Sequence, residues 1–207
     1  PNIQFDWVVE ERFQMIPAWH PAVDKVIPVA IRRWRKSLLS KQTRAEIKVF
    51  FKSLRETSYD LVIDAQGLLK TAWIVKKVKA PSCGLNFKSA REPLASLFYN
   101  RGVFVRKDQH AVERVRQLFS QALYYSYPVG MADYCVDKEK WQTPQKPYVL
   151  FFHGTTWANK HWPIAYWKSL ASMLRQQGMA VKLSWGSDDE REASQVIADD
   201  VEGIDIL

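Results

Sequence analysis

The sequence predicts an α/β protein made of two Rossmann-like domains, both of them incomplete in this chain. Strand-like and helix-like segments alternate along the 207 residues, which is typical of parallel sheets with helical crossovers. The alternation stops once, at the proline-containing stretch D-K-E-K-W-Q-T-P-Q-K-P, and then starts again. We therefore expect a first domain over residues 1–137, a linker over 138–147, and the start of a second domain over 148–207.

The elements of the first domain follow from hydrophobic periodicity and capping residues. Apolar runs predict strands at residues 3–9, 26–30 (a shorter one), 59–63 and 103–105, with a short strand or turn at 84–86. Helices are expected at residues 41–56, 68–78, 91–99 and 109–124. Pro93 would lie in the first turn of the third helix, and Asp108 would cap the fourth. The inward faces would be Ile47, Phe50, Phe51 and Leu54 on the first helix, and Val112, Val115, Leu118, Phe119 and Ala122 on the fourth.

The second domain repeats the pattern more regularly. Strands are expected at residues 148–152 and 180–184, and helices at 163–177 and 188–198. Pro163 suits the first position of its helix, and Gly178 is expected as its C-cap.

Composition narrows the class of protein without naming a partner. The formal net charge of +8 favours acidic partners, whether nucleic acid, anionic lipid or a phosphorylated substrate. Cys83 and Cys135 stand far apart and in no metal-ligand spacing, so we expect both to be small buried hydrophobes in a reducing cytosol. No apolar run approaches the about 20 residues of a membrane span. Because the chain starts without Met in a strand pattern and stops within an apolar stretch, we expect a fragment cut at both ends.

The most informative segment is Y-V-L-F-F-H-G-T-T-W-A-N-K-H-W-P, residues 148–163. A buried strand ends there in a small-residue turn with two hydroxyls, and a lysine precedes the next helix. Thr155, Thr156 and Lys160 supply the donors and the cation that a diphosphate needs beside a helix N-terminus. The spacing of these residues is not that of a Walker motif. Thr and Lys between a strand and a helix also occur simply as capping residues or for solubility. We expect the neighbouring His153 and His161 to be structural.

Three further groups carry possible chemistry. The loop S-W-G-S-D-D-E at 184–190 follows a strand, and there Ser187 is expected to cap a helix whose dipole the acids complement. The run I-R-R-W-R-K at 31–36 is strongly basic, and Arg32, Arg35 and Lys36 would share a helical face that binds an anion, nucleic acid included, or only water. Asp64 ends a strand and could act as a general base, although we favour a structural role in capping the next helix.

The amino-acid sequences of four segments resemble those of the lipopolysaccharide heptosyltransferases of glycosyltransferase family 9. These segments are H-G-T-T-W-A-N-K-H-W-P, A-I-R-R-W-R-K, K-S-A-R-E-P-L-A-S-L-F-Y-N and H-A-V-E-R. The resemblance spans nearly the whole chain, and the acceptor-side wording favours the type I members. It implies a GT-B fold and inverting transfer of L-glycero-D-manno-heptose from ADP-heptose to Kdo of the lipopolysaccharide inner core (Kdo2-lipid A).

The same resemblance implies roles for individual residues. Donor binding would fall to Thr155, Thr156, Lys160 and Glu190, the last on the nucleoside. Acceptor binding would fall to Arg32, Arg35, Lys36, Arg91 and Arg114. The catalytic base is expected upstream of Pro1, so we expect no catalytic residue in this fragment and no transfer by it. Trp157, Ala158 and Asn159 depart from the charged residues that members often carry.

The resemblance also implies partners and a location. The partners would be ADP-heptose, Kdo2-lipid A and an anionic inner-membrane surface, with no nucleic acid, no metal and no cofactor. The protein would be cytoplasmic and peripheral on the cytoplasmic face of the inner membrane of a Gram-negative cell. The alternatives are a heptosyltransferase II-type enzyme with a heptose acceptor, and a basic nucleic-acid-binding protein.

Overall fold

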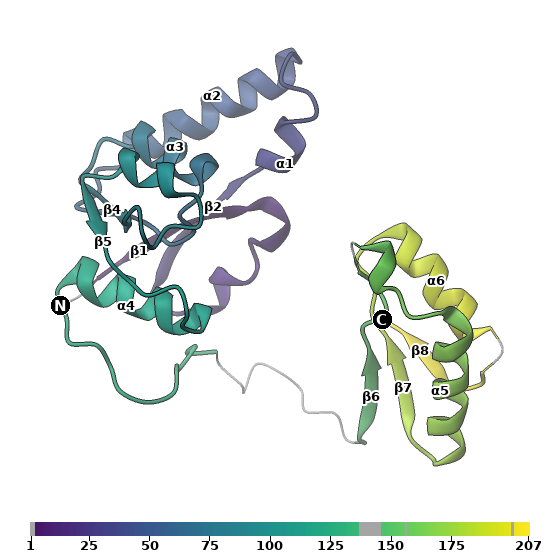
Figure 1. The fold of residues 1–207 in the computed structure, drawn as a ribbon. Helices are drawn as coiled ribbons and strands as arrows, with labels where there is room; N and C mark the ends of the chain where they lie inside the picture. Colours follow the sequence, from purple (N-terminus) through teal and green to yellow (C-terminus); the bar gives the residue numbers. More distant parts are fainter. Residues whose placement is uncertain (1–2, 137–145, 156, 200) are drawn as a thin grey trace. The chain divides into compact units, whose positions relative to one another are not determined.

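The computed structural model describes residues 3–136, 146–155, 157–199 and 201–207 (Figure 1). The chain divides into two compact units, Pro1–Asp137 (unit 1) and Lys138–Leu207 (unit 2). Most of the stretch predicted as a linker, residues 138–145, lies outside the described residues. Every strand pairing in both units is parallel, as the alternation of strands and helices predicts.

Unit 1 contains two small parallel sheets. The first pairs β1 (Phe5–Glu10) with β2 (Val23–Val29), and the second has the order β3 (Val62–Asp64), β4 (Ser82–Leu85), β5 (Arg101–Val103). The prediction that the second strand is shorter than the first was wrong, since β2 has seven residues and β1 has six. In a parallel sheet the strands all end at one edge, so the loops after them gather there.

The helices of unit 1 are α1 (Ile31–Trp34), α2 (Lys41–Glu56), α3 (Leu69–Lys77) and α4 (Ala111–Leu123), with 3₁₀ turns η1 (Glu11–Phe13), η2 (Pro17–Trp19) and η3 (Pro93–Phe98). The α-helix predicted at 91–99 is therefore the 3₁₀ turn η3, where Ser96 Oγ donates to the Pro93 carbonyl at 2.8 Å and Ala95 N–H donates to the Glu92 carbonyl.

The cap predicted for α4 was also wrong. The N-cap residue is His110, whose Nδ1 accepts from the Val112 N–H at 3.3 Å. The carboxylate of Asp108 instead accepts from Arg106 Nε at 3.1 Å, so it is turned away from the helix. Within α4, Leu118 and Ala122 are buried as predicted, whereas Val115 is exposed.

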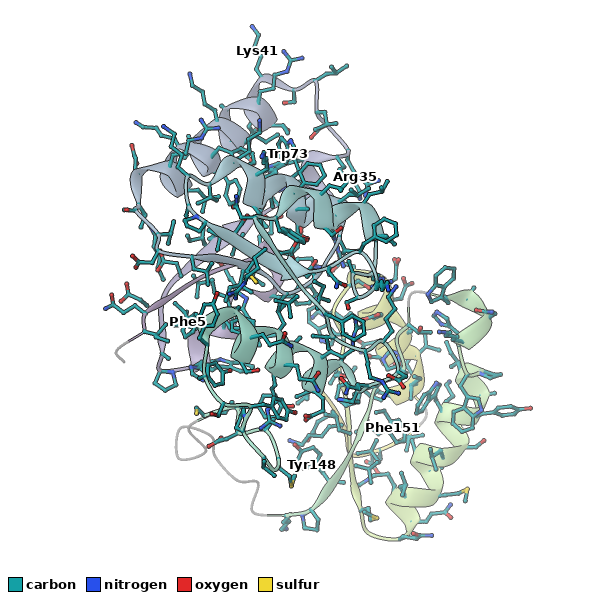
Figure 2. All side chains as sticks on the ribbon, turned by 60° about the vertical axis from the view of Figure 1, so that its left-hand side comes forward. Phe5, Arg35, Lys41, Trp73, Tyr148 and Phe151 are labelled. Atoms are coloured by element: carbon teal, nitrogen blue, oxygen red, sulfur yellow. The ribbon has the colours of Figure 1, made fainter. Side chains whose placement is uncertain are left out.

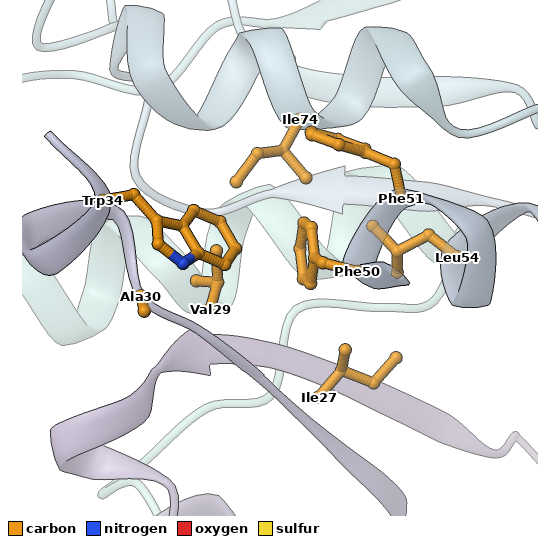
Figure 3. Close-up of a cluster of buried hydrophobic side chains, with 8 residues drawn as sticks. All are labelled: Ile27, Val29, Ala30, Trp34, Phe50, Phe51, Leu54 and Ile74. Carbon is orange, nitrogen blue, oxygen red and sulfur yellow. The ribbon is translucent and has the colours of Figure 1, made fainter. Parts of the chain in front are cut away.

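A cluster of apolar side chains joins α2 to the first sheet (Figure 3). The buried face of α2 supplies Phe50, Phe51 and Leu54, as its periodicity predicts, and Ile47 packs at the margin. Trp34 and Phe50 meet edge to face with ring centroids 5.6 Å apart, and the Trp34 indole N–H donates to Glu46 at 2.9 Å. This packing fixes the start of the basic segment that follows β2.

A second cluster in unit 1 surrounds Cys83 and Leu118, both fully buried. The expectation of a buried thiol is thus confirmed for Cys83. It was wrong for Cys135, which is exposed near the end of unit 1.

Unit 2 is a three-stranded parallel sheet with the order β6 (Tyr148–Phe151), β7 (Ala180–Leu183), β8 (Ile204–Ile206). Its helices α5 (Ile164–Gln176) and α6 (Asp188–Ala198) pack against each other (Figure 1). Pro163 is the N-cap residue of α5 and so lies one position before the predicted one, while Gly178, predicted as the C-cap, directly follows the observed C-cap Gln177. The core is made of Phe151, Ala171, Val181, Leu183, Ile197 and Val201.

Candidate functional site

In unit 2 the loops after β6 and β7 lie at the same edge of the sheet. Because β6 and β7 are parallel neighbours, residues 152–163 and 184–187 both leave from the carboxyl ends of the strands, where open α/β sheets bind ligands. Ser184 fastens the two strand ends together, since its N–H and its hydroxyl both donate to the Phe151 carbonyl, at 3.3 and 3.2 Å.

The two loops meet at Gly154 and Glu190. A Cβ on Gly154 would overlap the Glu190 carboxyl group, so the absence of a side chain there creates the place that this carboxylate occupies. The other oxygen of Glu190 accepts from the Gly186 N–H at 2.8 Å. Glu190 is thus held between the loops, and only part of its surface is exposed.

His153 connects the first loop to α6 through a hydrogen bond to Ser194. It is buried, and its Nε2 lies 2.7 Å from Ser194 Oγ. The single hydroxyl proton of Ser194 is directed at the Glu190 carbonyl, 3.0 Å away, so His153 Nε2 is the donor toward Ser194. This chain of bonds ties the backbone at residue 153 to the first turn of α6, as the structural role expected for His153 requires.

The environment of His153 keeps the ring neutral. Burial lowers its pKa, the nearby charge of Glu190 opposes that effect, and His161 adds to the lowering. A lowered pKa means that the unfolded chain, with a His pKa of about 6.5, takes up more protons than the folded one as the pH falls below that value.

We therefore expect unit 2 to be stable above about pH 6.5 and to lose stability as the pH falls from there toward the lower pKa of the folded state. A urea titration followed by the backbone amide NMR signals of β7 measures this effect. His153→Gln keeps a donor for Ser194 without a titrating ring and should flatten the pH dependence between about 5.5 and 7.5. An unchanged slope in that variant would contradict the assignment.

The first loop is cationic and the second is acidic. Lys160 is exposed at the end of the 3₁₀ turn η5 (Ala158–Lys160), and no Asp or Glu occurs between residues 152 and 167. The first turn of α6, by contrast, holds Asp188, Asp189 and Glu190, and Ser187 caps it by accepting from the Glu190 N–H at 3.3 Å, as predicted. An anionic group is therefore favoured at the first loop, and hydroxyl donors are favoured at Glu190.

Thr155 and His161 close the first loop on itself. His161 Nε2 donates to the Thr155 carbonyl at 2.9 Å, so the expected structural role of His161 agrees with the geometry. Thr155 is partly buried, and Thr156 lies outside the described residues. The sequence did not reveal that Gly154 makes room for Glu190, because the two residues are distant along the chain.

In unit 1 the basic segment 31–36 contains four cations. Arg33 forms ion pairs with carboxylates, and the other three are exposed. Arg33 donates to Glu11 through Nε and Nη2, both at 3.1 Å, and to Glu46 through Nη1 at 2.7 Å, and these bonds raise its pKa. The Arg32 backbone N–H donates to Glu10 at 3.2 Å, and its exposed guanidinium lies over the Phe13 ring, 5.9 Å from the centroid. Arg35 and Lys36 are also exposed, and Figure 2 shows Arg35 at the surface. The structure thus leaves Arg32, Arg35 and Lys36 accessible to an anion.

Arg91 and Arg114 flank one loop, residues 86–92, which follows β4. Arg91 is exposed on it, and the partly buried Arg114 reaches it from α4, donating through Nη2 to the Ser89 carbonyl at 2.6 Å. Arg114 is therefore not a freely solvated position on α4. On the same helix, Glu113 and Arg116 form a 3.1 Å ion pair.

Asp64 fixes the turn between β3 and α3. Its Oδ1 accepts from the N–H groups of Gln66 and Gly67, at 2.8 and 3.2 Å. Its Oδ2 accepts from the hydroxyls of Thr71 and Tyr99, both at 2.7 Å. The carboxylate is buried and has four donors, so it has no free lone pair with which to deprotonate a substrate. A structural role therefore fits this geometry, but the predicted capping of the next helix was wrong. The N-cap residue of α3 is Leu68, and Asp64 accepts instead from the N–H groups of the turn before it.

The described ranges contain no cluster of three or more His, Cys, Asp or Glu side chains suited to a metal ion. None of the described helices combines the length and the apolar character that a membrane span requires.

Comparison with known proteins assigns the chain to a family. The family model described as glycosyltransferase family 9 (heptosyltransferase) matches residues 47–207. The chain belongs to this family. Its α/β fold of parallel sheets matches that of solved family 9 enzymes, and structures of E. coli heptosyltransferase WaaC, with ADP and with ADP-2-deoxy-2-fluoro heptose, superpose with a TM-score of 0.93 at 45% identity.

Two similar curated proteins are both named lipopolysaccharide heptosyltransferase 1. Lipopolysaccharide heptosyltransferase 1 of Pseudomonas aeruginosa is 55% identical over the whole of this chain, and that of Escherichia coli K12 is 46% identical. The chain spans 59% and 66% of the length of these two relatives, and the WaaC structures are covered to 66% and 67%. The structure of E. coli ADP-heptose lps heptosyltransferase II shares the fold, with a TM-score of 0.64 at 20% identity.

Proposed function

We propose that this glycosyltransferase family 9 protein transfers L-glycero-D-manno-heptose from ADP-heptose to Kdo of the lipopolysaccharide inner core. The observation that carries the proposal is the pairing of a cationic loop with an acidic one, in which Glu190 is partly buried, at the sheet edge of unit 2. Identity favours the type I reaction, because the relatives at 55% and 46% are named heptosyltransferase 1 and the heptosyltransferase II structure shares only 20%.

In the proposed donor site the two loops divide the nucleotide between them. Lys160 and the hydroxyls of Thr155 and Thr156 hold the diphosphate, next to the N-terminus of α5. Glu190 accepts hydrogen bonds from the ribose hydroxyls. A carboxylate suits these donors, whereas it would repel a phosphate. As the glycosidic bond breaks, negative charge grows on the departing ADP, and Lys160 stabilises it. This division requires no metal ion or cofactor.

In the proposed acceptor site the cations of unit 1 bind carboxylates and phosphates. Arg32, Arg35 and Lys36 extend from the segment after β2, and Arg91 and Arg114 flank the loop after β4. Arginine forms bidentate hydrogen bonds to both groups. The acceptor of this reaction is a lipid, so we place the enzyme at the cytoplasmic face of the inner membrane.

The proposal is tested by the affinity for ADP, measured by isothermal titration calorimetry. Lys160→Met should weaken binding about 30-fold, because a charged hydrogen bond to phosphate is worth about 2 kcal/mol, while Lys160→Arg should retain most of the affinity. Lys146→Met is the matched control, since it removes the same charge from an exposed lysine just before β6, at the opposite edge of the sheet.

Two results would contradict the proposal. One is equal ADP affinity in Lys160→Met and Lys146→Met. The other is salt-sensitive binding of duplex DNA by a chain that does not bind ADP, which would favour the nucleic-acid-binding alternative. Binding of a heptose-terminated acceptor in preference to a Kdo-terminated one would favour the type II reaction.

We further expect these 207 residues to bind ADP without transferring heptose. They span about three fifths to two thirds of the length of the relatives, and among them we assign no catalytic base. Release of ADP from ADP-heptose in the presence of a Kdo-terminated acceptor would overturn this expectation and leave the donor assignment standing.

A further inference from the structure

The turn that joins α1 to α2 exposes two leucines among cations. This turn, residues 35–44 (the basic turn), reads R-K-S-L-L-S-K-Q-T-R and contains no acidic residue. Leu38 is 55% exposed and Leu39 is 84% exposed. Arg35 and Lys36 precede the leucines, and Lys41 and Arg44 follow them. The two leucines thus form a small exposed apolar spot that has cations on both sides of it in the sequence.

Hydrogen bonds hold the basic turn in a defined shape. The Ser40 N–H donates to the Ser37 carbonyl at 3.0 Å, and the Ser37 and Thr43 hydroxyls lie 2.9 Å apart. Arg44 Nε donates to the Leu38 carbonyl at 3.4 Å. The leucines are therefore presented outward by an ordered turn, at the tip of unit 1 where α1 passes into α2 (Figure 1), with the labelled Arg35 and Lys41 at the surface (Figure 2).

We propose that the basic turn docks on an anionic phospholipid bilayer. Leu38 and Leu39 would enter the boundary between headgroups and acyl chains, and the four cations would lie among the lipid phosphates. This combination of a small apolar tip and surrounding basic residues is complementary to such a surface in both polarity and charge. The inference deepens the proposed function, because a lipid-linked acceptor would then be reached from a protein already on its membrane.

The composition of the basic turn favours a bilayer over other anionic partners. Single-stranded nucleic acid is bound by aromatic side chains that stack on bases, and residues 35–44 contain none. Aliphatic side chains contribute nothing to phosphate contacts on a duplex. In a lipid interface, by contrast, the leucines contact acyl chains and the cations contact phosphates, so both contribute to binding.

Sedimentation with phospholipid vesicles free of lipopolysaccharide tests the proposal. The wild-type chain should bind vesicles containing phosphatidylglycerol and should bind pure phosphatidylcholine vesicles weakly, with release at about 0.5 M salt. The double variant Leu38→Ser/Leu39→Ser should lose about 30-fold in partition coefficient. The double variant Leu94→Ser/Leu97→Ser is the matched control, since those leucines are 55% and 74% exposed elsewhere on unit 1, and it should lose less than about 3-fold.

Three outcomes would overturn the proposal: no binding to anionic vesicles, equal binding to neutral ones, or equal losses in the two double variants. ADP affinity measured on the same proteins separates this failure from failure of the proposed function. Both double variants should bind ADP like the wild type. Vesicle binding by a chain that does not bind ADP would refute the donor site and leave the docking surface standing.

Discussion

Replacing Asp64 with alanine should destabilise unit 1 by about 4 kcal/mol, because two of its four donors, the Gly67 N–H and the Tyr99 hydroxyl, are buried and lose their acceptor. The four donors are the two backbone N–H groups and the hydroxyls of Thr71 and Tyr99. The Tyr99 phenol suffers most, since burial and the charge of Asp64 raise its pKa and keep it a donor with no other acceptor given to it. Removing one donor instead, with Tyr99→Phe, should cost only about 1 kcal/mol.

The buried thiol of Cys83 offers a measurement confined to unit 1. In a Cys135→Ser background, which removes the exposed thiol, the labelling rate of Cys83 reports how often unit 1 opens. Asp64→Ala should raise that rate by about 1000-fold and Tyr99→Phe by about 5-fold. Similar rates in both variants would show that Asp64 is not the centre of this network.

Replacing Gly154 with alanine should weaken ADP binding by about 100-fold, because the new Cβ displaces the Glu190 carboxylate and breaks its 2.8 Å bond from Gly186. The overlap falls on the end of a flexible side chain, which can swing away, so the fold of unit 2 should tolerate the change. Loss of affinity without loss of stability is the expected signature in calorimetry combined with urea unfolding.

Gly186→Ala is a matched control for that prediction. Its Cβ would make only an ordinary 3.4 Å contact with the same carboxylate, so the ADP affinity should change less than about 3-fold. A double-mutant cycle sharpens the test, because Gly154→Ala should cost little more once Glu190→Ala has removed the displaced group. Additive losses would mean that Gly154 acts on the nucleotide directly, and not through Glu190.

Periodicity and chain order determined much of what the sequence could reveal. The bounds of α2 and α6, at Lys41–Glu56 and Asp188–Ala198, agree with the prediction because both have strong apolar faces, and Ser187 clearly caps the second. Parallel pairing followed from alternation. Errors arose where several polar residues competed for one role, as when Arg106 took the carboxylate of Asp108 and left His110 to cap α4.

The sequence proposes residues for the candidate site but does not indicate how they are arranged. The resemblance of the motifs to the family pointed to Lys160 and Glu190. Only the structure shows that Glu190 fills the space beside Gly154 and that His153 contacts Ser194. Likewise the sequence does not show that Arg33 is neutralised by Glu11 and Glu46 while its neighbours stay exposed. Such relations depend on contacts between distant parts of the chain, which periodicity does not record.

The exclusively parallel pairing of the strands also bears on how the chain folds. Phe5 cannot meet Val23, nor Tyr148 meet Ala180, until the intervening crossover has been ordered, so the strands that the structure describes offer no hairpin as a quick local nucleus. Refolding should therefore be slow for a protein of this size. On the ribosome, however, β1 to β5 of unit 1 are all synthesised before β6, and vectorial synthesis lets them pair before the sequence of unit 2 competes for the same pairings.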